Sequence, residues 1–256
     1  MKTAWDDSLG SPINTKSLAM RNSLLKVILT LFLYFFCSNL LFTEINLCDF
    51  DIKYMIGKGF YSKVFLVTKI DTNEPYAMKV IKKSQLKNEE SKTKIMTEKL
   101  IMRMCDSPFI AKLHYAFQTS TKFYFILDFV NGGELQSKLI EKNKFSEELA
   151  KFYASEILMA LKWLHGHNVL YRDLKPKNIL VDFEGHIKLI DFGLSKLNWE
   201  VKDLKRIVWG TPHYVAPEIL LGKEHTTSMD FWSLGIVIFE MLHGYFPFIS
   251  GTMKSA

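Results

Sequence analysis

The stretch YRDLKPKNIL runs from Tyr171 to Leu180. It places the carboxylate of Asp173, the ammonium of Lys175 and the amide of Asn178 close together in sequence, and it then ends on apolar residues. Opposite charges and an amide in one short segment are typical of a site that positions a charged group. Polar residues that only cap neighbouring strands are the alternative interpretation, so the surrounding sequence has to decide between the two.

The sequence before this stretch predicts a sheet with a single helix. Short runs rich in β-branched and aromatic residues predict five strands, and helical spacing from Ser91 to Met104 predicts one helix. The predicted strands are FDIKYMIGKG, KVFLVTKI, EPYAMKVIKK, AKLHYAFQT and KFYFILDFV. The apolar positions of the predicted helix are Ile95, Leu100, Ile101 and Met104.

The tripeptide Asn131-Gly132-Gly133 breaks this pattern and is the best candidate for a domain boundary. Helices dominate after it. The longest is predicted from Ser146, its N-cap, to His165–Asn168, and the last runs from about Met229 to Leu242. Two short strands are predicted between them, at NILVD and HIKLID.

The composition of the 256 residues, 48% hydrophobic and 23% charged, suits one large core or two modest ones. A net charge of +6 favours an anionic partner, or it reflects a solvated basic face. The run KVIKKSQLKNEESKTK mixes both signs and lacks interleaved aromatic residues, so we expect no nucleic acid as a partner. Three widely spaced cysteines indicate a reducing compartment and no structural zinc.

Further motifs accompany the opening stretch, in a fixed order along the chain. They are GKGFYSKV (Gly57–Val64), YAMKV (Tyr76–Val80), DFG (Asp191–Gly193), GTPHYVAPE (Gly210–Glu218) and DFWSLG (Asp230–Gly235). From about Asp49 to Phe248 the chain therefore resembles eukaryotic protein kinases, and it is most similar to the AGC group of Ser/Thr kinases, which includes protein kinase A, Akt and S6 kinase.

The resemblance implies an α+β fold of two lobes, with a small β-rich N-lobe and a larger, mainly helical C-lobe. The expected division is an N-terminal extension over residues 1–48, the N-lobe over 49–130 and a C-lobe over 131–256. Compared with the family the C-lobe looks truncated, because further helices and the AGC C-terminal tail are expected after it.

ATP is the cofactor that the resemblance implies. Lys79 would hold the α- and β-phosphates and pair with Glu98, since an unpaired lysine in a cleft is costly. Leu127 looks like the gatekeeper, followed by the hinge from Asp128 to Val130. The remaining expected nucleotide contacts come from the glycine loop and the pocket walls: Gly57, Lys58, Gly59, Tyr61, Ser62, Val64, Ala77 and Leu180.

The same resemblance assigns the opening stretch to phosphoryl transfer, which needs positioning and charge neutralisation more than covalent chemistry. Asp173 would accept the proton of the attacking hydroxyl, and Lys175 would lie beside the transferred phosphate. Asn178 and Asp191 would ligate Mg²⁺, which prefers hard oxygen ligands. Further residues with implied supporting roles are Thr211 beside Asp173 and Lys175, Asp230 beneath the catalytic loop, and a spine of Met102, Leu113, Phe192 and Tyr171.

Several positions depart from the family pattern. Ser62 replaces the third glycine of the glycine loop. Ile207 stands where AGC kinases carry a Thr that is phosphorylated on activation, so Arg172 has no phosphate to pair with. The carboxylate of Glu200 or Asp203 could take the place of that phosphate. Glu134 matches the residue that receives an Arg three places before the target hydroxyl. Lys177 replaces a Glu that helps to receive a second Arg, so the expected basic preference is altered and centres on position −3.

A further departure concerns Glu218, whose family partner is an Arg on a helix that this sequence lacks. We expect Glu218 to be unpaired, and roughly 3–5 kcal/mol is lost when one partner of a buried pair is removed.

The sequence thus predicts an ATP- and Mg²⁺-dependent Ser/Thr protein kinase that prefers basic residues before the target. A catalytically weak or inactive nucleotide-binding regulatory protein is the alternative. Protein substrates with Ser/Thr acceptors are the expected partners, and the oligomeric state is unknown.

The apolar segment from Leu24 to Phe42 remains separate from this interpretation. It is borderline in length for a membrane span, for which about 20 apolar residues are needed. Because basic residues precede it, a span would place the kinase-like part outside the cell, away from nucleotide. A membrane-associated helix, a helix covered by protein and a segment without a role stay open, and we expect a cytoplasmic location.

Overall fold

The computed structural model describes residues 45–59, 62–199, 211–223 and 226–248. Apart from Ile45, these residues belong to one compact unit that begins at Asn46. Within the described ranges, no helix combines the length and the apolarity that crossing a membrane requires. The apolar segment Leu24–Phe42 lies outside the described residues, so its three interpretations stay open.

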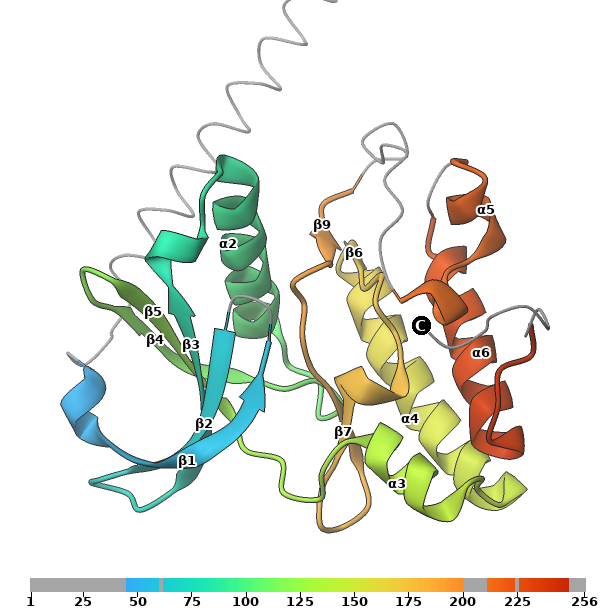
Figure 1. Cartoon of the computed structure of the whole chain (residues 1–256), viewed down its shortest axis with the longest axis horizontal. Coiled ribbons are helices and arrows are strands. Elements are labelled where there is room, and N and C mark those ends of the chain that lie inside the picture. The colour runs from blue at the N-terminus through green and yellow to red at the C-terminus, as the bar shows by residue number, and fades with distance from the viewer. Residues whose placement is uncertain (1–44, 60–61, 200–210, 224–225, 249–256) are drawn as a thin grey trace, which may run out of the picture. The chain divides into compact units, whose positions relative to one another are not determined.

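The N-terminal half of the unit is an antiparallel sheet (Figure 1). Its strand order is β1-β2-β3-β5-β4, which places β3 at the centre. The predicted five strands are confirmed, with these bounds: β1 Phe50–Lys58, β2 Ser62–Lys69, β3 Pro75–Lys82, β4 Leu113–Gln118 and β5 Lys122–Asp128. The register pairs Val64 with Lys79 and Ala77 with Leu127, so residues far apart in sequence become neighbours on one sheet.

The helix α2, Glu89–Met104, begins two residues before the predicted start. Asn88 is the reason, because its side chain accepts a hydrogen bond from the backbone of Ser91 at 2.9 Å and caps the helix there. The 3-10 helices η1 (Leu47–Asp49) and η2 (Lys83–Gln85) flank the first strands.

The predicted apolar face of α2 is partly wrong. Met104 is 43% exposed, whereas Met102 is 1% exposed and lies in the main core. The buried face is centred on the carboxylate of Glu98, which sequence periodicity counts as polar. Because an acidic residue occupies the middle of the inward face, the apolar pattern alone places that face incorrectly.

The C-terminal half is mainly helical. Its α-helices are α3 (Leu135–Lys142), α4 (Glu147–Gly166), α5 (Pro217–Leu220) and α6 (Ser228–His243). Its strands are β6 (Val169–Leu170) paired with β9 (Lys196–Leu197), and β7 (Ile179–Val181) paired with β8 (Ile187–Leu189). Its 3-10 helices are η3 (Pro176–Asn178) and η5 (Pro212–Tyr214). The two-lobed α+β fold is therefore confirmed.

The two long helices α4 and α6 lie side by side (Figure 1). Ser146 caps α4 as predicted, accepting from the backbone of Leu149 at 3.2 Å. One continuous core runs from α2 and the sheet into these helices, and it includes Met102, Phe125 and Leu161. The short helix α3 and the two-residue strands β6 and β9 were not predicted, because segments this short carry too few periodic positions.

The glycine pair at the predicted boundary has two different roles. Gly133 adopts φ +83°, a left-handed conformation that favours glycine. Position 132 has no room for a side chain, because a Cβ there would lie 2.3 Å from the carbonyl oxygen of Val181. The connection between the sheet and α3 is therefore packed against β7.

Replacement of Met102 by alanine should destabilise the unit by about 2–5 kcal/mol, because it opens a cavity in the core. The same change at Met104, on the exposed face of α2, should cost less than about 1 kcal/mol. Urea denaturation of the two variants measures both values. Equal losses would show that the face of α2 is not as described.

Candidate active site

The first component of the site is an ion pair between the sheet and α2. Lys79 of β3 donates to the carboxylate of Glu98, and both side chains are largely buried, at 14% and 4% exposure. The Oδ1 atom of Asp191 lies 3.7 Å from the same ammonium. Burial lowers the pKa of Lys79, but the two carboxylates outweigh it and raise the pKa above its ordinary value. Lys79 is therefore a fixed positive charge.

The opening stretch folds into a compact hydrogen-bonded group. Lys175 donates to Oδ2 of Asp173 at 2.8 Å and to the hydroxyl of Thr211 at 2.9 Å. The side-chain nitrogen of Asn178 donates to the same Oδ2 at 2.8 Å and to the backbone carbonyl of Asp173 at 2.9 Å. The structure thus brings together the four residues for which a catalytic role was predicted.

The carboxyl group of Asp173 is nearly buried, and this changes its acidity. Burial raises its pKa, and the bonds from Lys175 and Asn178 offset only part of that rise. A carboxylate with a raised pKa is a better proton acceptor than an exposed one. The site therefore combines a carboxyl group of raised pKa with a lysine held beside it.

A buried carboxylate anchors the backbone just before Asp173. Asp230 of α6 is fully buried, and it accepts the backbone N–H groups of Tyr171 at 3.0 Å and Arg172 at 2.8 Å. His165 of α4 lies 2.8 Å from its Oδ2 atom. The role of Asp230 was predicted, whereas that of His165 was not, because a lone histidine at a helix end carries no sequence signal. Arg172 itself adopts φ 68°, and its Nε atom donates to the carbonyl of Leu194 at 2.6 Å.

The segment DFG turns sharply beside the base. Asp191 adopts φ 61° and leaves its carboxylate 51% exposed, while the next residue, Phe192, is fully buried. The ring of Phe192 meets that of Tyr171 edge-on at 5.4 Å, and the Tyr171 hydroxyl donates to the carbonyl of Ile190 at 2.5 Å. The four residues of the predicted spine all belong to the same core.

Further residues predicted to bind the nucleotide lie on the β1–β2 hairpin and on β7. In the hairpin of β1 and β2, Gly57 pairs with Val64, and the backbone N–H of Gly59 donates to the carbonyl of Ser62 at 2.9 Å. A Cβ at Gly59 would lie 2.8 Å from the Ser62 hydroxyl, so the serine fills the space that this glycine leaves. Leu180 of β7 bridges to Glu134, which places the floor of the predicted pocket beside the predicted substrate residue.

Lys58 ends β1, and Val130 is buried immediately after the last strand of the sheet. Tyr61 lies outside the described residues, as do Ile207, Glu200 and Asp203, so the structure says nothing of the predictions that rest on them.

Glu218 receives a hydrogen bond from a hydroxyl, where the family resemblance implies an arginine. Its side chain is half-buried, and the hydroxyl of Ser228 donates to it at 3.1 Å. The start of α6 passes beside Glu218 and supplies this donor, which sequence spacing does not reveal. The cost expected for an unpaired buried carboxylate therefore does not apply.

The donor set fits a magnesium-bound nucleotide. Asn178 uses its amide nitrogen for Asp173, and its amide oxygen is the atom suited to a cation. Asp191 supplies one half-exposed carboxylate, 3.7 Å from the ammonium of Lys79. Within the described part of the chain, no cluster of three or more His, Cys, Asp or Glu could hold a metal alone. Mg²⁺ typically binds through one or two carboxylates plus substrate phosphates, so two protein ligands are sufficient.

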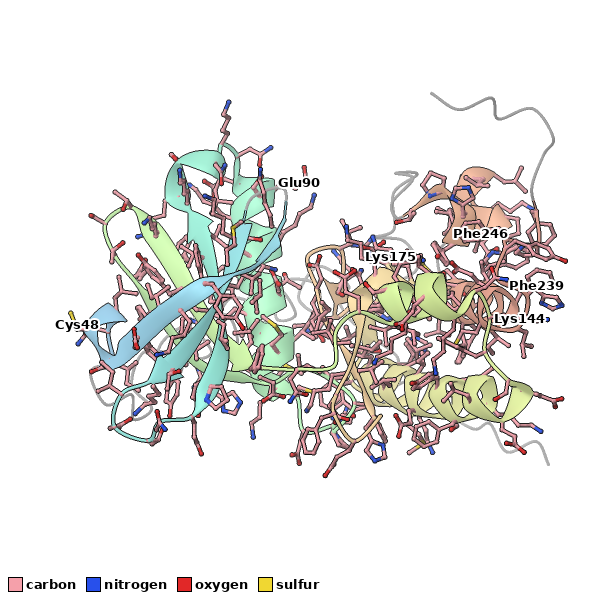
Figure 2. All side chains as sticks on the ribbon, turned by 60° about the horizontal axis from the view of Figure 1, so that its bottom comes forward. Cys48, Glu90, Lys144, Lys175, Phe239 and Phe246 are labelled. Atoms are coloured by element: carbon pink, nitrogen blue, oxygen red, sulfur yellow. The ribbon has the colours of Figure 1, made fainter. Side chains whose placement is uncertain are left out.

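Figure 2 shows where this chemistry lies within the unit. Lys175 lies between Cys48, at the outer end of the sheet, and Phe239, at the far end of the helical half. The reacting groups are therefore placed centrally in the described unit.

Comparisons with known proteins agree with this geometry. The protein kinase domain family matches residues 50–256. Serine/threonine protein kinase ypkA of Aspergillus fumigatus is 45% identical over 205 residues, which is 80% of this chain and 32% of that protein. Ribosomal protein S6 kinase alpha-2 of Mus musculus is 46% identical over 210 residues, covering 81% and 28%.

Serine/threonine-protein kinase Sgk2 of Homo sapiens is 44% identical over 203 residues, covering 79% of this chain and 55% of that protein. The chain spans about a third of the length of the first of these relatives and about half of the human one. The predicted resemblance to AGC-type kinases is confirmed, because an S6 kinase is among the relatives. Since the family match covers most of the sequence and the site carries the matching groups, the chain belongs to the protein kinase domain family.

Proposed function

We propose that this chain transfers the γ-phosphate of ATP to Ser and Thr hydroxyls of protein substrates. The observation that carries the proposal is the bonded group of Asp173, Lys175, Asn178 and Thr211. It holds a base, a positive charge and an amide oxygen in one place, and Asp191, 3.7 Å from the ammonium of Lys79, connects it to the pair of Lys79 and Glu98. Phosphoryl transfer asks a protein for this combination of positioning and charge neutralisation.

Asp173 has a defined task in this proposal. Its Oδ2 atom is held by Lys175 and Asn178, which fixes the orientation of the carboxylate. The Oδ1 atom is the one left to accept a proton from the substrate hydroxyl. Lys175 stays positive and stabilises the negative charge that develops on the transferred phosphate.

The nucleotide would be held by residues on both sides of the base. Lys79 would contact its phosphates, and Asn178 and Asp191 would ligate Mg²⁺. A bound Mg²⁺ neutralises phosphate charge and stabilises the leaving oxygens. The ammonium of Lys79 already lies between Glu98 and Asp191 and is largely buried, so the contact to phosphate requires no further burial of the lysine.

The substrate preference follows from two charges. Glu134 is half-buried before α3, and its backbone forms a bridge to Leu180. Its carboxylate would receive a basic side chain of a bound peptide. Lys177 is exposed one residue before Asn178, and it repels a second basic side chain. We propose a single basic preference, at position −3.

The central test is transfer of radiolabelled phosphate from ATP to a peptide with Arg at −3 and Ser as acceptor. The Asp173→Asn variant should lower kcat by roughly 10²–10⁴-fold, the range typical of a lost general base. Asp51→Asn, an exposed change on β1, is the matched control and should leave kcat unaltered. Nucleotide binding by the wild-type chain without any transfer would favour the regulatory alternative.

The acidity of Asp173 gives a second test. The carboxylate is the active form, so the rate should fall as pH falls through its raised pKa. The acidic limb of kcat/KM should therefore lie above the ordinary Asp range of about 3.9. Lys175 lowers the pKa of Asp173. In the Lys175→Met variant, the acidic limb of the residual kcat/KM should therefore lie at a still higher pH than in the wild-type chain. A limb that does not move between the two proteins would contradict this role of Lys175.

Peptide libraries test the proposed preference. Arg selection at −3 should weaken about 5-fold or more in Glu134→Gln, since an ion pair at a partly desolvated site is lost. Lys177→Glu should instead gain Arg selection at −2. Strong selection of Arg at −2 by the wild-type chain would overturn the role given to Lys177.

A further inference from the structure

A second polar group joins the two halves of the unit, away from the reacting residues. Asp128, the last residue of β5, uses both carboxylate oxygens. Its Oδ1 atom lies 2.6 Å from Nε2 of His114 on β4. Its Oδ2 atom accepts from the ammonium of Lys188 on β8 at 2.9 Å and from the backbone of Lys112 at 3.1 Å. One carboxylate therefore connects three segments of the chain.

Backbone bonds run through the same junction. The N–H of Asp128 donates to the carbonyl of Lys112 at 3.1 Å. Leu189 of β8 accepts from Ala111 at 2.9 Å and donates to Phe109 at 2.8 Å. The chain before β4 is therefore bonded to β8 by main chain on one side and to Asp128 on the other. A shift of β8 would have to break the side-chain bond from Lys188 as well.

The carboxylate of Asp128 stays negatively charged at neutral pH. Burial alone would raise the pKa of Asp128, but the bonds from His114 and Lys188 lower it to about 2. The side chains of Asp128, Lys188 and His114 keep 21%, 24% and 29% exposure. Partly exposed ion pairs contribute little to global stability, with typical values of about 0–1 kcal/mol. Their main effect is then on geometry.

Two functional segments are fixed by this geometry. Asp128 is the first residue of the expected hinge, Asp128 to Val130, to which the resemblance to protein kinases assigns the pairing with adenine. Lys188 lies three positions before Asp191, the proposed metal ligand. The bond between Lys188 and Asp128 thus sets the distance between the base-binding segment and the carboxylate that would hold the cation.

We propose that Lys188 and His114 are positioning residues for nucleotide binding. Through the carboxylate of Asp128 they hold the adenine-binding segment in register with Asp191. This inference rests on the proposed function, because it assumes that ATP occupies the site between these segments. It adds residues to which the kinase motifs give no role.

The test compares Lys188→Met with the wild-type chain. Its dissociation constant for MgADP by calorimetry and its KM for ATP should both rise by about 2–5-fold, the most that an ion pair of this exposure can contribute. The kcat should change less than about twofold, because the reacting groups are untouched. Lys188→Arg should restore most of the affinity. Lys53→Met, which removes an exposed ion pair on β1, is the matched control and should bind as the wild type does.

A double-mutant cycle tests the connection through Asp128. If Lys188 acts through this carboxylate, Lys188→Met should add little to the nucleotide affinity already lost in Asp128→Asn. Independent, additive losses would overturn the proposal. So would a lowered thermal midpoint of Lys188→Met with an unchanged dissociation constant, since that is the behaviour of a purely structural pair.

The calorimetric readout separates this inference from the proposed function. Wild-type chain that binds MgADP but transfers no phosphate would reject the phosphotransferase proposal, and the affinity ratio of Lys188→Met would still decide the role of the junction. Phosphate transfer by wild type together with wild-type affinity in Lys188→Met would reject the positioning role alone. Wild-type chain that binds no nucleotide would reject both.

Discussion

The buried carboxylate of Asp230 is the constraint on which the catalytic loop depends. It accepts two consecutive backbone N–H groups, from Tyr171 and Arg172, and it takes a third contact from His165. A carboxyl group without exposure is stable only when its oxygens are hydrogen-bonded, so its position is fixed by these partners. The left-handed backbone of Arg172 follows directly from this requirement. Asp173 is the residue directly after this anchored segment.

Other carboxylates in the unit also accept hydrogen bonds from elements that are distant in sequence. Glu98 receives Lys79, Asp128 receives His114, Lys112 and Lys188, and Glu156 receives His186 and the backbone of Ile187. Each one connects elements that lie far apart in sequence. The apolar core holds the elements together, but it is not directional. The bonds to these carboxylates are directional, so they fix how the connected elements are oriented.

The sequence predicted those parts of the structure whose signal is local. The five strands, the N-cap at Ser146 and the grouping of Asp173, Lys175 and Asn178 follow from alternation, capping chemistry and motif spacing. It could not predict parts that depend on contacts between distant segments. The outward turn of Met104, the hydroxyl that meets Glu218 and the bonds of Asp128 all require the tertiary fold. The family resemblance supplied the site, whereas the physical pattern alone supplied a sheet, a boundary and a helical half.

The raised pKa of Lys79 has a consequence for chemical labelling. Reagents that acylate or sulfonylate lysines react with the neutral amine. The two neighbouring carboxylates raise the pKa of Lys79 and so lower the fraction of its amine that is neutral. Withdrawal of α2 would remove Glu98 and return the amine toward ordinary acidity in a partly desolvated setting. The labelling rate of this one amine thus reports where α2 lies relative to β3, and it does so in the absence of any substrate.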